Sequence, residues 1–201
     1  MCRLLFESIR VQDGRPCLLE YHQARVNRSL DAGCAFDLAQ AVRGMRLPEK
    51  GVFKLRVSYA SDGGPGAVAC DAYAPRVVRS LRLVECPALR YDRKFEDRRA
   101  LLAARAVAAD ADEAVLTREG WVTDASYANL AFGRPGDWVT PSTFLLAGTK
   151  RAFLLDEGLL RECPVHVRDL PRYEFVTLIN AMLDPGDVMV PFAALKGLEL
   201  P

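Results

Sequence analysis

Histidine is scarce in this chain, and its scarcity excludes several kinds of site. The 201 residues include only two histidines, His22 and His166. A Ser-His-Asp triad or a zinc centre needs imidazoles that converge with other groups, so neither is expected here. We therefore expect no metal site and look for catalytic groups of another kind.

Closely spaced cysteine pairs are missing as well. Six cysteines are scattered along the chain without a CxxC pair, namely Cys2, Cys17, Cys34, Cys70, Cys86 and Cys163. A disulfide framework is typical of shorter secreted proteins. We expect these side chains to be reduced thiols in a cytoplasmic protein.

The chain also lacks an excess of charge and any long apolar run. Its 27 basic and 26 acidic residues give a formal net charge of +1. No basic field favours nucleic acid as a partner. No apolar run approaches the ~20 residues that span a bilayer. The opening MCRLLFESIR has its charges too close to its apolar residues for a signal peptide. We expect a globular protein that binds neither nucleic acid nor a membrane.

Half of the residues are hydrophobic, which suffices for one large domain or two small ones. In the first part, periodicity and turn residues predict strands at 3–11, 17–21, 51–60 and 67–74, and helices at 22–33 and 36–45. An extended stretch at 75–93 suggests the boundary between a smaller lobe, 1–80, and a larger lobe, 81–201.

The second part carries a similar mixture of patterns. We predict a helix at 98–111, hairpins at 113–124 and 129–141, a helix after Gly148, and strands at 163–170 and 174–183. Strands with segregated helices indicate an α+β fold rather than a doubly wound sheet.

Four features could carry chemistry, although each has an ordinary explanation. Lys94 lies in the charged stretch YDRKFEDRR, where most lysines are solvated cations. Asp124, in VTDASYANLAF, could simply turn the chain. Gly148 and Thr149 precede a helix, where free amides favour a phosphate but also start ordinary helices. Arg25, on a predicted helix, could grip the same phosphate.

One cofactor would use all four features together. Pyridoxal phosphate needs a lysine amine, a carboxylate at its pyridine nitrogen, and a phosphate cup of amides, hydroxyls and an arginine. The combination therefore favours a pyridoxal 5′-phosphate enzyme over four unrelated surface features.

The chain resembles the class IV aminotransferase family, the fold-type IV pyridoxal phosphate enzymes. FESIRVQDGRPCLLEYHQARVNRS is similar to the family's F-E-x-I-R strand, D-G turn and H-x-x-R helix. KFEDRRALL, DEAVLTREGWVTDASYANLAF, VTPSTFLLAGTKRAFLL and LINAML follow in the family's order, so the resemblance covers nearly the whole chain. It implies a two-lobed fold with an N-terminal α/β sandwich and a C-terminal barrel-like β domain with helices, and a homodimer.

The resemblance also implies a role for individual residues. Lys94 would be the Schiff-base lysine, and Asp124 would be the partner of the pyridine nitrogen. The remaining cofactor-binding residues would be Arg25, Asn129, Gly148, Thr149, Lys150 and Asn180. Of these, Arg25 would bind phosphate through its side chain, and Thr149 and Lys150 through their amides. Arg151 is expected to be structural.

Three activities stay open at this stage. The first is transfer of an amino group from an amino acid to a keto acid. The second is 4-amino-4-deoxychorismate lyase activity, which releases pyruvate and 4-aminobenzoate; DEAVLTREGWVTD and the N-A-M triplet favour it. The third is non-catalytic binding of pyridoxal phosphate, suggested by the short segment before the first strand. The chain also differs from the family in having Asp124 in place of glutamate and Lys150 in place of threonine.

Overall fold

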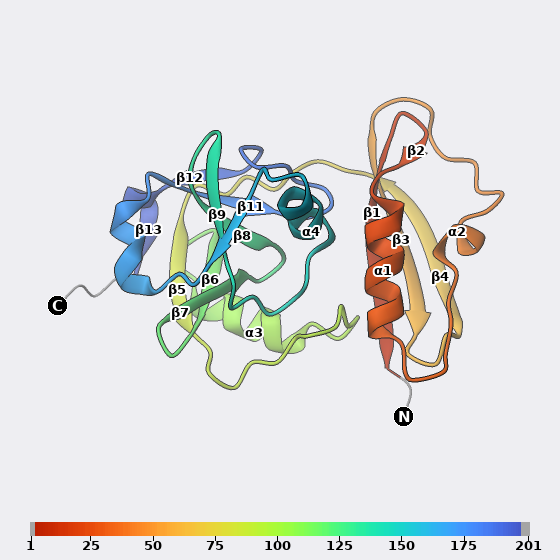
Figure 1. Ribbon diagram of the computed structural model, residues 1–201, viewed down its shortest axis with the longest axis horizontal. Coiled ribbons are helices and arrows are strands. Elements are labelled where there is room, and N and C mark those ends of the chain that lie inside the picture. Colours follow the sequence, from red (N-terminus) through yellow and green to blue (C-terminus); the bar gives the residue numbers. More distant parts are fainter. Residues whose placement is uncertain (1–2, 198–201) are drawn as a thin grey trace. The chain divides into compact units, whose positions relative to one another are not determined.

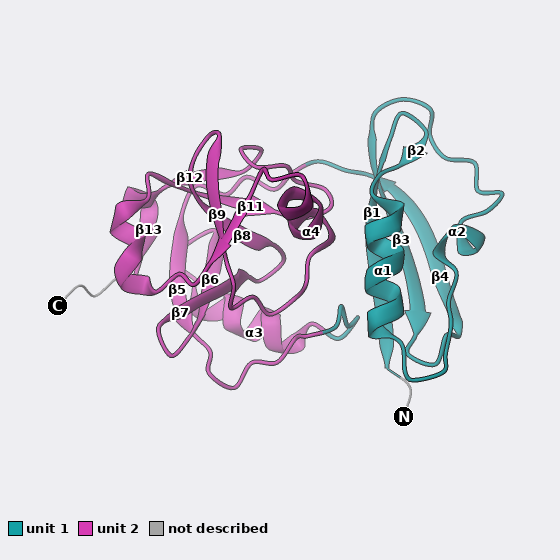
Figure 2. Ribbon diagram, viewed as in Figure 1, with its two compact units in different colours: residues 1–74, 93–97 teal, residues 75–92, 98–201 magenta. Residues whose placement is uncertain are grey.

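A computed structural model describes residues 3–197 of the protein, and Cys2 lies outside this range. The chain divides into two compact units, which we call unit 1 (residues 1–74 and 93–97) and unit 2 (residues 75–92 and 98–201) (Figure 2). This division differs in two places from the predicted division into residues 1–80 and 81–201. Residues 75–80 belong to unit 2, and the segment 93–97, which includes Lys94, belongs to unit 1.

Unit 1 is a four-stranded sheet with its helices on one face (Figure 1). The strand order is β2-β1-β3-β4, and all neighbouring strands are antiparallel. The elements are β1 (Leu4–Gln12), β2 (Arg15–Pro16), α1 (Leu19–Ser29), α2 (Leu38–Ala41), β3 (Val52–Ala60) and β4 (Pro65–Ala72).

Alternation along β1 and β3 builds the core of unit 1. Buried residues of α1 and α2 pack against the odd-numbered positions of both strands, the period expected when one face of a sheet is covered. The β1–β2 turn uses Asp13 (φ 48°) and Gly14 (φ 79°), the Asp-Gly pair favoured in tight hairpins.

Unit 2 contains two sheets. One has the order β10-β9-β8-β11-β12, and the other β13-β5-β6-β7. Within residues 3–197, hydrogen bonds therefore join its strands into two sheets rather than one closed barrel. The strands are β5 (Leu81–Glu85), β6 (Glu113–Arg118), β7 (Trp121–Ala125), β8 (Asn129–Arg134), β9 (Asp137–Pro141), β10 (Arg161–Cys163), β11 (Phe175–Ile179), β12 (Met189–Pro191) and β13 (Leu195–Lys196).

Helices α3 (Arg99–Val107) and α4 (Thr149–Asp156) accompany these sheets, together with the 3-10 helices η1 (Val167–Arg172) and η2 (Phe192–Ala194). Strands β5 and β6 are parallel neighbours, and α3 contacts both. Helix α4 contributes Leu154 to a core cluster with Ala131 of β8 and Ile179 of β11.

The α+β prediction and both predicted hairpins are confirmed. Two predicted strands are wrong. Residues 17–21 do not return along β1, because pairing ends at Pro16 and the chain turns at Leu18 (φ 53°) into α1. The predicted strand 163–170 ends at Cys163, since Pro164 offers no amide hydrogen to extend β10, and the chain enters η1 at Val167. The predicted helix 22–33 begins earlier and ends at Ser29.

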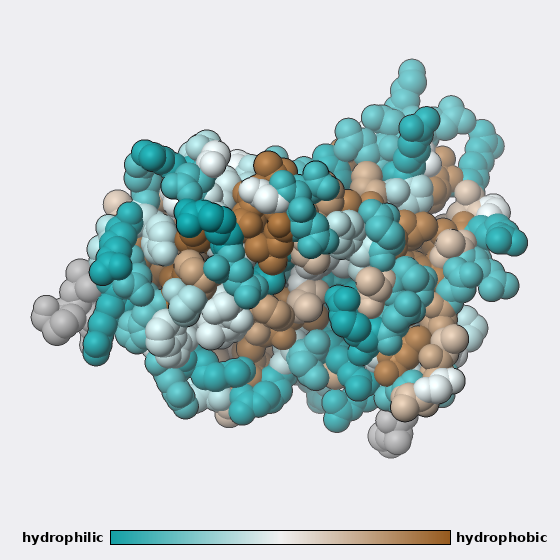
Figure 3. Space-filling view, in the orientation of Figure 1, coloured by the Kyte–Doolittle hydropathy of each residue, from teal (hydrophilic) through white to brown (hydrophobic). Residues whose placement is uncertain are grey.

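No helix within residues 3–197 combines the length and hydrophobicity that crossing a membrane requires. Hydrophilic side chains cover much of the face seen in Figure 3, with smaller apolar areas among them. The cysteines within the described range are free thiols, namely Cys17, Cys34, Cys70, Cys86 and Cys163. No cluster of three or more potential metal ligands occurs in this range.

Candidate functional site

A charged residue interrupts the apolar row of β1. Leu5, Ile9 and Val11 line the core of unit 1, and Glu7 lies in the same row with no exposed surface. Helix α1 presents His22 and Arg25, one turn apart, to this carboxylate. A buried carboxylate is tolerated when it is paired and hydrogen-bonded, and both conditions hold here.

Glu7 binds both side chains directly. The Arg25 Nε donates to Glu7 Oε1 at 2.9 Å, and a second guanidinium nitrogen donates to Oε2. Burial opposes ionisation of Glu7, but the Arg25 charge and the hydrogen bonds from His22 and Arg25 lower its pKa to about 2. Glu7 is therefore a fixed anion that holds the Arg25 fork in place.

The Glu7 carboxylate also fixes the tautomer of His22. His22 Nδ1 lies 2.6 Å from Glu7 Oε2, and burial lowers the pKa of His22. An ionised carboxylate can only accept, so Nδ1 carries the hydrogen of the neutral ring. The Nε2 atom is then a buried acceptor without a hydrogen-bond partner among residues 3–197.

Lys94 is held against β1 by backbone hydrogen bonds. The Phe6 amide donates to the Lys94 carbonyl at 3.0 Å, and the Glu96 amide donates to the Leu4 carbonyl at 2.9 Å. Lys94 Nζ lies 4.8 Å from the centre of the Phe6 ring. Phe6 and Glu7 point to opposite faces of β1. Lys94 and Arg25 are therefore both attached to β1, Lys94 through its backbone and Arg25 through the Glu7 side chain.

In unit 2, Asp124 lies at the end of β7, and Asn129 begins β8. A tight connection brings them together, closed by a 2.8 Å bond from the Ala125 amide to the Ala128 carbonyl. Asn129 Nδ2 donates to Asp124 Oδ1 at 2.7 Å. The amides of Leu145 and Leu146 donate to Asp124 Oδ2 at 3.0 and 2.9 Å.

Burial dominates the titration of Asp124. Its side chain is almost completely shielded from solvent. Burial raises the pKa of Asp124 to about 6, although the three hydrogen bonds and the charge of Arg151 act in the opposite direction. The carboxylate would thus be stabilised by a cation placed against it.

Helix α4 begins with a set of free donors. Gly148 is its N-cap, and the amides of its first turn have no acceptor within the helix. The Thr149 hydroxyl is buried there and has no hydrogen-bond partner among residues 3–197. An anion would supply the missing acceptor at the positive end of the helix.

Two of the predicted residues have other partners. The Lys150 ammonium pairs with the Asp184 carboxylate, so its charge is already compensated. Asn180 Oδ1 accepts from the Met182 amide at 2.8 Å, and its Nδ2 lies 3.4 Å from the Tyr127 carbonyl. Both side chains thus hold local structure here.

Some of these groups fit pyridoxal phosphate. The unpartnered Thr149 hydroxyl and the α4 amides suit a phosphate, and the raised pKa of Asp124 suits a protonated ring nitrogen beside it. Lys94 and Arg25 belong to unit 1, and the remaining predicted residues belong to unit 2. The side chains of Lys150 and Asn180 are engaged in local contacts instead.

Glu7 and His22 are not among the predicted site residues, although both contact or adjoin Arg25. Two patterns could have identified them. The odd positions of β1 are apolar except for Glu7, which marks a charge that needs a partner. His22 and Arg25 share one helix face, where such a partner would lie.

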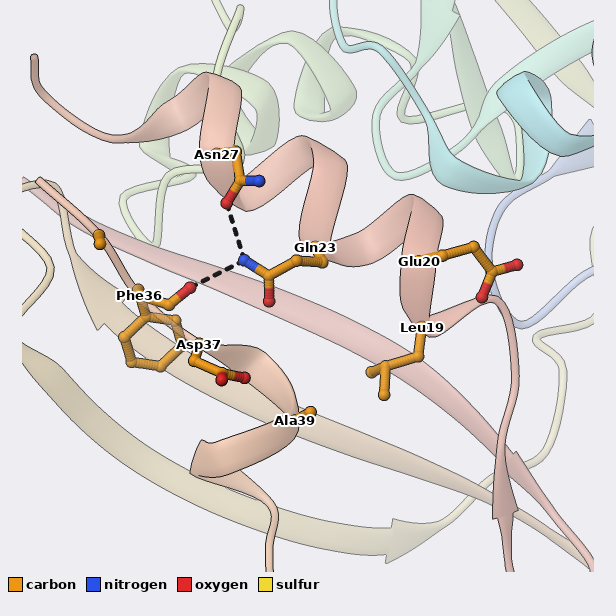
Figure 4. Close-up of a pocket in the computed structure, with 8 residues that line it drawn as sticks. Leu19, Glu20, Gln23, Asn27, Phe36, Asp37 and Ala39 are labelled. Carbon is orange, nitrogen blue, oxygen red and sulfur yellow. Dashed lines mark hydrogen bonds between the residues drawn. The ribbon is translucent and has the colours of Figure 1, made fainter.

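An open groove of about 620 Å³ lies elsewhere on unit 1 (Figure 4). Its lining comprises Leu19, Glu20, Gln23, Asn27, Ala35, Phe36, Asp37 and Ala39. Gln23 Nε2 donates to Asn27 Oδ1 and to the Phe36 carbonyl, both at 2.8 Å. The groove therefore marks where a loop is fastened to α1, and it contains none of the predicted site residues.

Comparison with known proteins gives consistent matches. Residues 95–188 match the family described as amino-transferase class IV. A crystal structure from Haemophilus somnus 129PT, provisionally named a 4-amino-4-deoxychorismate lyase, is 32% identical and has a TM-score of 0.80. The similarity covers 90% of this chain and 96% of that one.

Two further structures share the fold. One from Mesorhizobium loti, provisionally named an amino-acid aminotransferase, is 25% identical with a TM-score of 0.74, covering 96% of this chain and 98% of its own. A hypothetical aminotransferase from Mycobacterium tuberculosis, in its PLP-bound form, is 20% identical with a TM-score of 0.67. It covers 99% of this chain and 83% of its own, and at this identity only the fold is comparable.

Proposed function

This chain belongs to the class IV aminotransferase family, and we propose from that membership that it is a pyridoxal 5′-phosphate-dependent enzyme. Its substrate would be a small amino-acid-like molecule that reacts at the carbon bearing the amino group. The observation that carries the proposal is the buried Asp124 carboxylate, whose pKa is raised to about 6 and which therefore favours a cationic partner.

The binding roles follow from the groups present. The Asp124 carboxylate would hold the proton on the ring nitrogen of the cofactor. The amides of Thr149 and Lys150 and the Thr149 hydroxyl would bind its phosphate, and Arg25, held by Glu7, would add a positive charge. When bound, the cofactor supplies an electron sink for the pair left behind as a substrate bond breaks.

Lys94 is the proposed catalytic residue. Its amine would join the cofactor covalently and, when released by substrate, would remove the proton from the carbon bearing the amino group and deliver it to another atom, which in the lyase reaction is on the departing three-carbon fragment. General acid–base catalysis of this kind typically contributes about 10²–10⁴-fold in rate.

Two activities fit this machinery. The relative that shares more sequence is the one provisionally named a lyase. We therefore place the release of pyruvate and 4-aminobenzoate from aminodeoxychorismate first, ahead of the amino transfer expected first from the sequence. Amino transfer to a keto acid is the second candidate, which the Mesorhizobium loti relative favours.

A substrate test separates these candidates. Purified protein loaded with pyridoxal 5′-phosphate is incubated with aminodeoxychorismate and no keto acid. Equal yields of pyruvate and 4-aminobenzoate support the lyase. Turnover only with an amino acid and a keto acid supports amino transfer, whereas bound cofactor without turnover on either would identify a passive binding protein.

Two variants connect the activity to Lys94. Lys94→Ala should abolish turnover, while the exposed Lys50→Ala should retain it. Normal turnover by Lys94→Ala would contradict the assigned mechanism.

Family membership also supports a homodimer, which sedimentation at several protein concentrations would test.

A further inference from the structure

Gly148 has an ordinary backbone conformation and an unusual amount of crowding. Its φ of −71° is accessible to any residue. A Cβ atom added at this position, however, would lie 1.8 Å from Asn129 Oδ1 and 3.0 Å from Asn129 Cγ. Real Cβ contacts are not that short, so any larger residue here would displace the Asn129 side chain. Glycine is needed for space rather than for flexibility.

Asn129 uses its amide group at the same point to connect two parts of unit 2. Its Nδ2 donates to Asp124 Oδ1 at 2.7 Å and to the Leu146 carbonyl at 2.9 Å. Both partners can only accept when Asp124 is ionised, which fixes the orientation of the amide. The Leu145 and Leu146 amides return two bonds to Asp124 Oδ2.

We propose that Asn129 and Gly148 form a positioning pair that holds the Asp124 carboxylate and the start of α4 as one rigid piece. Gly148 leaves the space in which the Asn129 side chain lies, and Asn129 fixes Asp124 from there. The significance for the cofactor rests on the proposed function: the group that would face the ring nitrogen and the amides that would bind the phosphate could not shift independently.

The pair predicts a specific dependence on pH. Asn129 donates to Asp124, and a hydrogen bond to a charged acceptor is stronger than one to a neutral acceptor. Removing the Asn129 side chain should therefore cost more when Asp124 is ionised than when it is protonated. The groups that face Asp124 are Asn129, the Leu145 and Leu146 amides and, by charge, Arg151 of α4. A general packing role for Asn129 would give a cost independent of pH.

A double-mutant cycle on the cofactor-free protein tests the pair. We expect Gly148→Ala and Asn129→Ala each to lower the folding equilibrium constant about tenfold or more. The double variant should be no worse than Asn129→Ala alone within about threefold, because the clash disappears with the side chain. Should Gly148→Ala fail to fold, recovery of folding in the double variant would support the pair equally well.

A matched control uses Gly64, whose φ is also not positive and whose added Cβ would meet the Asp62 side chain at 3.2 Å and the Ala60 Cβ at 3.5 Å. Gly64→Ala should combine additively with Asn129→Ala. Additive losses for Gly148→Ala and Asn129→Ala would overturn the proposal.

The second readout is the effect of pH. The loss in folding equilibrium constant caused by Asn129→Ala should be about tenfold greater at pH 8 than at pH 4. An equal loss at both values would also overturn the positioning role. Both measurements are made without cofactor, so they can succeed even if the proposed enzymatic activity fails.

The consequence for the cofactor is measured separately. Titration with pyridoxal 5′-phosphate should show at least about tenfold weaker binding to Asn129→Ala than to wild type. Asn27→Ala, which alters an exposed asparagine of α1, should bind normally. Weak binding to all three proteins would count against the proposed function, while tight binding to all three would count against the pair.

Discussion

Asp124 and Glu7 are both buried carboxylic acids, and their surroundings shift their pKa values in opposite directions. Glu7 has the Arg25 guanidinium against it, and its pKa falls to about 2. Asp124 has amide donors and a more distant charge, and its pKa rises to about 6. Amide groups alone therefore do not offset the desolvation of Asp124, whereas a directly paired cation does so for Glu7.

This difference predicts how the cofactor-free protein responds to pH at Asp124. Its pKa is about 6 in the folded state, compared with 3.8 for an ordinary aspartate side chain in water. The stabilising contribution of a raised pKa is complete below the lower value and is lost as pH rises through the higher one. We expect wild type to lose about 2 kcal/mol relative to Asp124→Asn between pH 4 and pH 8.

Denaturant unfolding of the two proteins at several pH values measures this difference. Comparing the pH dependence, rather than the absolute free energy of unfolding, removes the separate cost of altering hydrogen bonds in the variant. A difference that does not change with pH would show that Asp124 titrates normally in the folded protein.

The prediction for Glu7 has the opposite sign. Its pKa moves from 4.5 down to about 2, so its contribution is present above the former value and is lost as pH falls through the latter. Glu7→Gln should cost about 3 kcal/mol at neutral pH, because it leaves the buried Arg25 charge without its anion. Glu20→Gln, at an exposed glutamate of α1 in the same unit, serves as the control and should change stability by less than about 0.5 kcal/mol. Similar values for both variants would contradict this account of the pair.

At the scale of secondary-structure elements, α3 shows how far local pattern determines structure. The alanine- and leucine-rich stretch predicts a helix, and α3 forms at Arg99–Val107. Its two adjacent leucines have different environments. Leu101 is 3% exposed and Leu102 is 58% exposed, because only one face of the helix packs on the sheet.

These leucines provide a matched pair of variants. Leu101→Ala should reduce the free energy of unfolding by about 2–5 kcal/mol, because it leaves a cavity in a packed core. Leu102→Ala should change it by less than about 0.5 kcal/mol, since the side chain is already in water. Thermal or denaturant unfolding compares the two, and equal losses would mean that α3 does not pack as described.

Other elements show what local sequence does not contain. The contact between Asp124 and Asn129 could have been predicted from the sequence, because strand periodicity and turn residues predict both hairpins and the short connection between them. The structure of residues 17–21 could not be predicted from periodicity alone, since CLLEY fits a strand, whereas Leu18 is the N-cap of α1 and the helix begins at Leu19. The Asn129–Gly148 contact joins distant parts of the chain and cannot be derived from either segment.

At the scale of the whole molecule, long-range contacts of the segment 93–97 decide which unit Lys94 belongs to. Its backbone bonds to Leu4 and Phe6 place Lys94 in unit 1, while the sequence on both sides of the segment belongs to unit 2. Composition and periodicity offer no signal for such a return. The proposed site residues are consequently distributed over both units, with Arg25 and Lys94 in unit 1.

The central claim, that Lys94 is the amine to which pyridoxal 5′-phosphate attaches, is tested most directly by chemical trapping. Protein saturated with the cofactor is reduced with borohydride, digested and analysed by mass spectrometry, with Lys50→Ala and Lys94→Ala treated in parallel. We expect a single pyridoxyl-modified peptide containing Lys94 in wild type and Lys50→Ala, and no modified peptide in Lys94→Ala. Stable modification of a different lysine, or cofactor that binds tightly yet is never trapped on Lys94, would contradict the account.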